Sequence, residues 1–183
     1  FWNQPIMLSD MPGWLNALYC DKTDTMWCSV EDNGIYQLDC NGNISRHIYT
    51  DGVVFSMFED SDGVFWVGIN GKGLYSFNRK KGKLELKYPL QGDFSIRCIT
   101  EDKHKNLYAA ILGEGILQYH LPTGKYQLLS RKNPIKGENN ITNYWIISIL
   151  CDSEDRIWFG HFGNISCYDT RNERFLDLPF EPE

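Results

Sequence analysis

The stretch EDSDGVFWVG, residues 59–68, places three carboxylates and a glycine shortly before a tryptophan. Such a cluster is typical either of a metal or catalytic site or of a tight turn between two strands. The same template returns at CDKTDTMWCS (20–29), EDKHKNLYAA (101–110) and CDSEDRIWFG (151–160). Because a feature that occurs four times favours architecture over chemistry, we interpret the acidic residues as turn formers.

The four copies align on an aromatic residue, and successive aromatics are 39, 42 and 50 residues apart. Repeats of this length are typical of propeller blades. An Asp stands six residues before each aromatic. These structural repeat residues are Asp21 and Trp27, Asp60 and Trp66, Asp102 and Tyr108, and Asp152 and Trp158. We expect all four rings to be buried.

Each copy predicts a meander of four strands. An apolar segment leads to the Asp, a second strand carries the aromatic, and two further segments follow after glycine-rich or polar turns. No segment has a 3.6-residue period. The sequence therefore predicts an all-β fold, a β-propeller of about four four-stranded antiparallel blades. An all-β sandwich is the alternative, but it does not require a constant interval between Asp and aromatic.

The expected boundaries follow the repeats. We predict blades at residues 14–50, 53–90, 95–130 and 145–178, with a long inter-blade loop at 131–144. Residues 1–13 are expected to be a lead-in or the end of a preceding blade, and 179–183 a tail. The first residues, FWNQPIMLSD, suggest a processed protein or an excised fragment.

Charge and hydropathy argue against several partners. The 183 residues include 18 Lys and Arg and 24 Asp and Glu, spread along the chain to a net charge of −6. No basic block offers a phosphate-binding surface, so we expect no nucleic acid partner. No apolar run approaches the roughly 20 residues needed to span a bilayer, so we expect no membrane contact by this segment.

The cysteines and histidines show no metal-ligand spacing. The six cysteines contain no C-x-x-C pair and the four histidines are isolated, so we predict no metal site and no cofactor. We expect buried free thiols. In an exported protein a disulfide becomes possible, and Cys20 with Cys151 is then the pair to consider because both hold the same register in their repeats.

A binding surface is expected where loops meet at one end of the blades. The loops from a fourth strand to the next first strand, and from a second to a third strand, should share this end. The candidate ligand-binding residues there are Trp145, Tyr144, Arg97, Asn70, Lys72 and His161. Aromatic rings with amides and charges suit a sugar or a protein interface. Each residue could also be an ordinary surface or packing residue.

The best copies resemble a known family. VVFSMFEDSDGVFWVGINGKGLYSFN (53–78) and IISILCDSEDRIWFGHFGNISCYD (146–169) are similar to the two-component regulator propeller repeat. The third copy departs from the pattern, with Tyr108 for Trp and Ala110 for Gly, and the first has Thr25 near the place of the turn glycine.

The resemblance implies the sensor region of a hybrid histidine kinase, periplasmic or otherwise outside the cytoplasmic membrane, in a membrane-anchored parent. It implies propellers of about seven blades, so that four repeats are part of a larger one. The remaining blades of the parent, or a second copy by self-association, would then cover the outer sheet faces.

Three functions follow as hypotheses. The first is a non-catalytic module that senses an oligosaccharide, the second is a scaffold for protein contacts, and the third is a lactonase-like or glycosidase-like propeller enzyme. The sequence offers no means of choosing a catalytic carboxylate pair, so we assign no catalytic residue. The sialidase-type Asp box does not fit, because Asp62 stands four and Asp60 six residues before Trp66.

Overall fold

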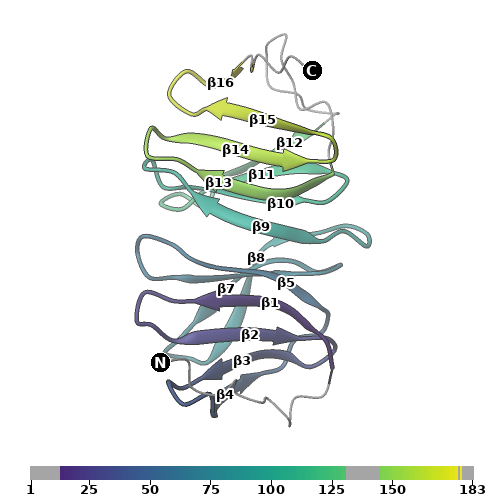
Figure 1. Cartoon of the computed structure of the whole chain (residues 1–183), viewed down its shortest axis with the longest axis vertical. Coiled ribbons are helices and arrows are strands. Elements are labelled where there is room, and N and C mark those ends of the chain that lie inside the picture. The colour runs from purple at the N-terminus through teal and green to yellow at the C-terminus, as the bar shows by residue number, and fades with distance from the viewer. Residues whose placement is uncertain (1–12, 131–144, 177, 179–183) are drawn as a thin grey trace, which may run out of the picture. The chain divides into compact units, whose positions relative to one another are not determined.

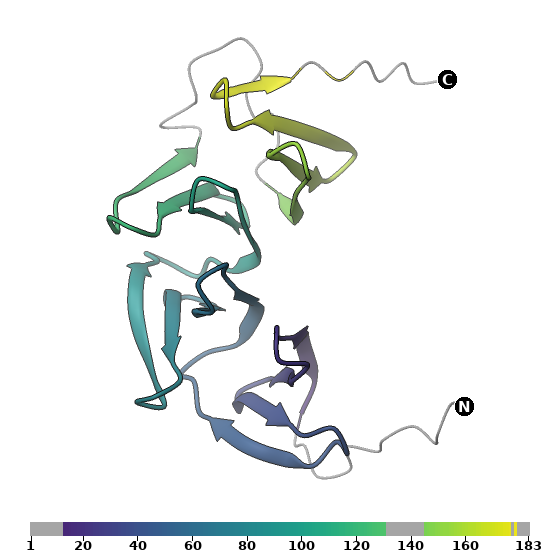
Figure 2. The ribbon, with the colours of Figure 1, turned by 90° about the vertical axis from the view of Figure 1, so that its left-hand side faces the viewer.

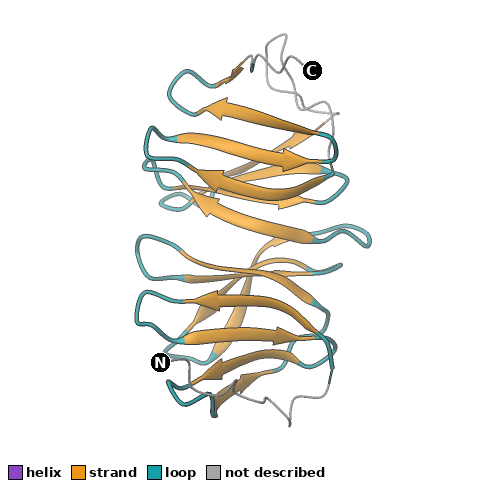
Figure 3. Cartoon of the chain, viewed as in Figure 1, coloured by secondary structure: helices purple, strands orange, loops and turns teal. Residues whose placement is uncertain are grey.

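The computed structural model describes residues 13–130, 145–176 and 178. These residues form strands, turns and loops without a helix (Figures 1 and 3). No part of the described chain has the length and hydropathy of a transmembrane helix. The all-β prediction is therefore confirmed.

The strands form four antiparallel sheets, each a meander of four consecutive strands. The first sheet contains β1 (Leu15–Cys20), β2 (Met26–Val30), β3 (Gly34–Leu38) and β4 (Ile44–Ile48). The second contains β5 (Val54–Glu59), β6 (Phe65–Ile69), β7 (Gly73–Asn78) and β8 (Lys83–Pro89).

The third sheet contains β9 (Ile96–Glu101), β10 (Asn106–Ile111), β11 (Gly115–His120) and β12 (Tyr126–Ser130). The fourth contains β13 (Ile146–Cys151), β14 (Arg156–His161), β15 (Asn164–Asp169) and β16 (Arg174–Leu176). The chain divides into two compact units, Phe1–Asp93 and Phe94–Glu183, with two sheets in each. Figure 2 shows the four sheets from a second direction.

The repeated Asp closes the turn between the first and second strands. In the second sheet one oxygen of Asp60, Oδ1, accepts the backbone N–H of Asp62 at 3.0 Å and of Val64 at 2.8 Å. The other oxygen, Oδ2, accepts the indole N–H of Trp66 at 2.8 Å. One carboxylate thus accepts hydrogen bonds from three N–H donors. The repeated Asp of EDSDGVFWVG therefore has a structural role.

The same arrangement recurs in every sheet. The ring donates to the Asp six residues earlier at 2.9 Å from Trp27, 3.0 Å from the Tyr108 hydroxyl and 2.8 Å from Trp158. The interval of six residues is therefore set by this turn, which places the aromatic side chain within hydrogen-bond distance of the Asp carboxylate.

In the first unit, aromatic residues fill the space between the two sheets. The Trp27 ring of β2 lies 4.8 Å from Phe65 of β6 and 6.0 Å from Phe77 of β7, measured between centroids. Ile35 and Val67 complete this core. A single four-stranded meander cannot bury this much apolar surface by itself. Each sheet is therefore stabilised by packing against a neighbouring sheet.

In the second unit, Tyr108 packs with Ile157, Phe159 and Tyr168 of the fourth sheet. Trp158 is an exception to our expectation, because it is only half-buried while Trp27, Trp66 and Tyr108 are buried. In the other sheet of this unit the ring points at the sheet that follows in the chain. Within the second unit no described sheet follows the fourth one to cover Trp158.

A lysine after the repeated Asp joins the two sheets of each unit. The backbone N–H of Lys22 donates to Glu59 Oε2 at 2.9 Å, and its ammonium group donates to the carbonyl of Asp60 at 2.6 Å. Arg79 Nη2 lies 3.2 Å from Asp21 and 3.3 Å from Glu59, which balances two buried carboxylates.

The second unit has the same junction with a different carboxylate. The backbone N–H of Lys103 donates to Asp155 Oδ1 at 2.8 Å, and its ammonium group donates to the carbonyl of Ser153. Asp155 lies in the turn with a φ of 69°, whereas Cys151 stands at the position that corresponds to Glu59. Thr170 Oγ1 donates to the carbonyl of Asp155 at 2.6 Å and fixes this turn.

Candidate functional site

Asn70 and Lys72 lie in the turn between β6 and β7. Asn70 Nδ2 donates to Asp93 Oδ1 at 2.8 Å, and Lys72 Nζ donates to Asp51 Oδ2 at 2.6 Å. Asp51 precedes β5 and Asp93 follows β8, so the structure brings these connections together at one end of the first unit. The hydrogen bond and charge of Asp51 raise the pKa of Lys72, which remains a cation on an exposed surface.

Arg97, Trp145 and His161 belong to the second unit. Arg97 is the second residue of β9 and is half-buried, and Trp145 directly precedes β13 with 56% of its surface exposed. β9 and β13 are neighbours, so these two residues lie at the same end of adjacent first strands. Tyr144 and the predicted loop 131–144 lie outside the described residues.

His161 is buried in the second unit, with 6% of its surface exposed. It ends β14, at the position that Val30, Ile69 and Ile111 occupy in the other sheets. Its Nε2 lies 2.9 Å from Ser166 Oγ, while Nδ1 has no hydrogen-bond partner among the described residues. Burial lowers the pKa of the imidazole, so the ring is neutral near pH 7.

The turn after His161 differs from the equivalent turn of the second sheet. Gly73 has a φ of +137°, and a Cβ on it would lie 2.0 Å from the carbonyl oxygen of Tyr88, so only glycine fits there. Asn164 occupies the corresponding place in the fourth sheet but does not have a positive φ. Gly163 supplies the positive φ instead, in a turn that is one residue shorter.

Apolar side chains are exposed along β13 and the β14–β15 turn. Ile147, Leu150 and Phe162 expose 54%, 62% and 70% of their surfaces, close in sequence to Trp145. Exposed apolar residues beside a polar rim are typical of a surface that another molecule or another sheet covers.

No cluster of the described residues suggests metal or redox chemistry. No group of three or more His, Cys, Asp or Glu side chains within the described ranges could hold a metal ion. All six cysteines are free in this structure, and Cys20 and Cys151 belong to different units. Cys28 and Cys167 are buried, Cys98 and Cys151 are partly buried, and Cys20 and Cys40 are exposed, so the expectation of buried thiols does not hold for all six.

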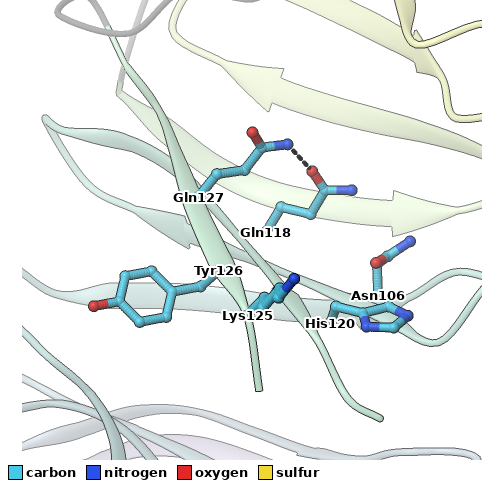
Figure 4. Close-up of a pocket in the computed structure, with 6 residues that line it drawn as sticks. All are labelled: Asn106, Gln118, His120, Lys125, Tyr126 and Gln127. Carbon is cyan, nitrogen blue, oxygen red and sulfur yellow. Dashed lines mark hydrogen bonds between the residues drawn. The ribbon is translucent and has the colours of Figure 1, made fainter. Parts of the chain in front are cut away.

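No sequence pattern predicts the polar groove that lies on the third sheet. It has a volume of about 280 Å³ and is lined by Asn106, Gln118, His120, Lys125, Tyr126 and Gln127 (Figure 4). These residues are spread over β10, β11, β12 and a turn, so no local pattern marks them. A sequence feature that distinguishes this sheet is Tyr108, which replaces the Trp of the other three copies.

Comparison with known proteins supports the resemblance of the repeat to a known family. The family model for the two component regulator propeller matches residues 48–71 and 140–163. No curated protein sequence matches this chain.

Several solved structures are similar. One is the extracellular domain of BT4673 from B. thetaiotaomicron, assigned as a hybrid two component system, with 22% identity and a TM-score of 0.67, covering 84% of this chain and 21% of that one. The corresponding domain of BT3049 from the same organism has 22% identity and a TM-score of 0.67, covering 87% and 21%. The chain thus spans about a fifth of the length of these domains.

Virginiamycin B lyase from Staphylococcus aureus is also similar, with 18% identity and a TM-score of 0.73, covering 93% of this chain and 58% of that one. That protein is an enzyme, but a likeness at this identity shows the fold alone. The β-propeller fold and the resemblance read from the sequence are confirmed, because two segments of the chain match the two component regulator propeller model and the similar solved structures share the fold.

Proposed function

We propose that this chain is part of the ligand-binding region of a sensor in a hybrid two-component system, located outside the cytoplasm in a membrane-anchored parent. The observation that carries the proposal is the pair of family matches at residues 48–71 and 140–163, each of which includes a repeat's turn and aromatic strand. The similarity to extracellular domains of two such systems supports the location.

The proposed ligand is an oligosaccharide, bound without catalysis. Trp145 exposes 56% of its surface, and an exposed indole can stack on a sugar ring. Arg97 lies at the same end of the neighbouring first strand. Asn70 and Lys72 offer an amide and a cation at the loop end of the first unit, although both are already engaged by carboxylates. His161 is buried, so its contribution would be to hold the β14–β15 turn through Ser166.

Binding would act on signalling by shifting an equilibrium between two arrangements of the parent protein. A ligand can do so only to the extent that it binds one arrangement more tightly than the other.

A thermal-shift screen of this chain with defined polysaccharide fragments tests the proposal. A specific ligand raises the melting temperature in a concentration-dependent manner, because it binds the folded state alone. Trp145→Ala is expected to need about tenfold more fragment for the same shift, whereas Leu86→Ala, which removes an exposed apolar side chain from β8, is expected to leave it unchanged. If fragments that shift the wild type shift Trp145→Ala equally, the ligand surface lies elsewhere.

A further inference from the structure

The groove on the third sheet contains an ordered chain of hydrogen bonds. Tyr108 OH lies 3.0 Å from Asp102 Oδ2, Gln118 Nε2 lies 3.0 Å from Tyr108 OH, and Gln127 Nε2 lies 2.5 Å from Gln118 Oε1. The strand register places Tyr108, Gln118 and Gln127 side by side on one face, since Tyr108 pairs with Gln118 and Gln118 with Gln127. Figure 4 shows the bond between the two glutamines.

The direction of every bond in this chain follows from its first member. The Asp102 carboxylate only accepts, so the Tyr108 hydroxyl must donate to it and can then only accept from Gln118. Burial raises the pKa of Tyr108, which keeps this proton in place. Gln118 therefore presents its oxygen to Gln127, and Gln127 keeps its own oxygen, Oε1, as an acceptor.

The chain depends on Tyr108. In the other sheets the corresponding residues are Trp27, Trp66 and Trp158, whose indole N–H donates to the repeated Asp and which carry no acceptor oxygen. A hydrogen-bond chain cannot continue through an indole. Gln37 of the first sheet has the register of Gln118, but it stands opposite Trp27 and has no such chain to join.

The other lining groups complement these acceptors. Asn106 Nδ2 donates to Asp102 at 2.8 Å, which leaves its Oδ1 as a second acceptor. Lys125 contributes an exposed ammonium group, and His120 contributes an imidazole that Thr123 holds through Nδ1 at 2.8 Å. Tyr126 exposes 55% of its surface, and its ring points away from the other labelled residues (Figure 4). Two amide oxygens and one cation thus line one small volume.

This set of groups selects for a particular ligand chemistry. Amide oxygens accept hydrogen bonds from hydroxyl groups. The oxygens of a phosphate or sulfate are also acceptors and cannot donate to the amide oxygens, so multiply charged anions are disfavoured. One ammonium group suits one carboxylate. The volume of about 280 Å³ is close to the lower end of the range for small-molecule sites and fits a single sugar ring.

We propose that the groove between Asn106, Gln118 and Gln127 binds a polyhydroxylated acid, with a uronic acid unit as its representative, whose hydroxyls donate to the amide oxygens and whose carboxylate pairs with Lys125. The groove lies at the end of the third sheet where Asp102 closes its turn. Arg97 and Trp145 mark the opposite strand ends, so this is a second site and does not rest on the proposed sensor surface.

Backbone amide chemical shifts of this 183-residue chain, titrated with D-galacturonate and with D-galactose, test the proposal. The two probes differ only in the oxidation of one carbon. We expect galacturonate to shift the signals of residues around 106, 118 and 125–127, and galactose to bind about fivefold more weakly because the pair with Lys125 is lost.

Variants separate the groove from the rest of the molecule. Gln127→Ala changes an exposed residue and Tyr108→Phe removes only the hydroxyl, and each is expected to weaken galacturonate binding about fivefold. Gln37→Ala removes the register-equivalent glutamine of the first sheet and is expected to bind as the wild type does. Trp145→Ala, which tests the loop-end surface, is also expected to leave this site unchanged.

Three results would overturn the proposal. The first is that galacturonate causes no chemical-shift changes, or causes them only outside the third sheet. The second is equal affinity for galacturonate and galactose. The third is that folded Gln127→Ala binds galacturonate as tightly as the wild type does. The amide spectrum of each variant shows whether it is folded, so lost binding in an unfolded variant is not counted as support, and Gln127→Ala decides if Tyr108→Phe does not fold.

Discussion

Asp155 accepts the backbone N–H of Lys103 at 2.8 Å and thereby joins the fourth sheet to the third. Glu59 makes the corresponding contact with Lys22 at 2.9 Å between the first two sheets. The acceptor comes from the end of a first strand in one unit and from the following turn in the other. The contact is thus retained while the residue that makes it has moved by four positions.

This relationship predicts a rescue. Asp155→Asn keeps the positive φ that Asn tolerates but removes the charge, and it should destabilise the second unit by about 1–2 kcal/mol. Adding Cys151→Glu, which restores the arrangement of Glu59, should recover at least part of this loss in denaturant unfolding. Cys20→Glu in the same background is the control and should recover none; equal recovery by both would mean that the carboxylate acts through general charge.

Among the acidic residues of each repeat, substitution of the Asp that closes the turn should destabilise the fold most. Asp60→Asn is expected to lower the free energy of unfolding by about 2 kcal/mol, because the amide cannot accept all three of the bonds that the carboxylate accepts. Asp62→Asn changes an exposed side chain in the same turn and should cost less than about 0.5 kcal/mol. Denaturation midpoints of the two variants provide the comparison, and equal losses would contradict the assignment.

Acid should remove part of the first unit's stability. Burial raises the pKa of Asp21, but hydrogen bonds from the Thr23 hydroxyl and the Trp27 indole outweigh burial and lower the pKa from 3.8 to about 2. Because the folded-state pKa is depressed, the ionised Asp21 stabilises the fold above pH 3.8, and this contribution is lost as the pH falls toward 2.

The consequence is a pH-dependent mutational effect. Asp21→Asn should cost about 2 kcal/mol at pH 7 and distinctly less at pH 2.5, measured by urea unfolding at both values. Asp24→Asn, an exposed position with a φ of 58° that suits Asn, should have a small effect at both. A cost of Asp21→Asn that is the same at the two pH values contradicts the depressed pKa.

The thiols should differ sharply in reactivity. Burial raises the pKa of Cys98 and of Cys151 to about 12 and that of Cys167 to about 11, and the thiolate is the reactive form. Alkylation of the native protein at pH 8, followed by mass spectrometry, should modify the exposed Cys20 and Cys40 first. All six should react in denaturant, and rapid native labelling of Cys151 would show that its strand opens.

The architecture was accessible from the sequence because its determinants are local. The interval between Asp60 and Trp66 is a turn and a hydrogen bond within one hairpin, so it repeats wherever the hairpin repeats. Burial of the ring depends on a neighbouring sheet, which is why the expectation was wrong for Trp158, in the last sheet described.

The sites were harder to predict because their members come from different strands. Gln118 and Gln127 are brought together by strand register, and His161 looks like a turn residue until its alignment with Ile69 and Ile111 shows a buried position. The useful signals were the departures from the repeat, Tyr108 for Trp and His161 for a β-branched residue, since they mark where one sheet differs from the others.

Alanine substitution of Trp145 and of Arg97 in the full sensor, with ligand affinity and induction of the target genes measured together, tests the sensor proposal most directly. We expect each variant to bind the oligosaccharide about tenfold more weakly and to require correspondingly more ligand for induction, while Leu86→Ala matches the wild type in both. Unchanged affinity and unchanged induction in both variants, with the fold intact, would remove this surface from the mechanism.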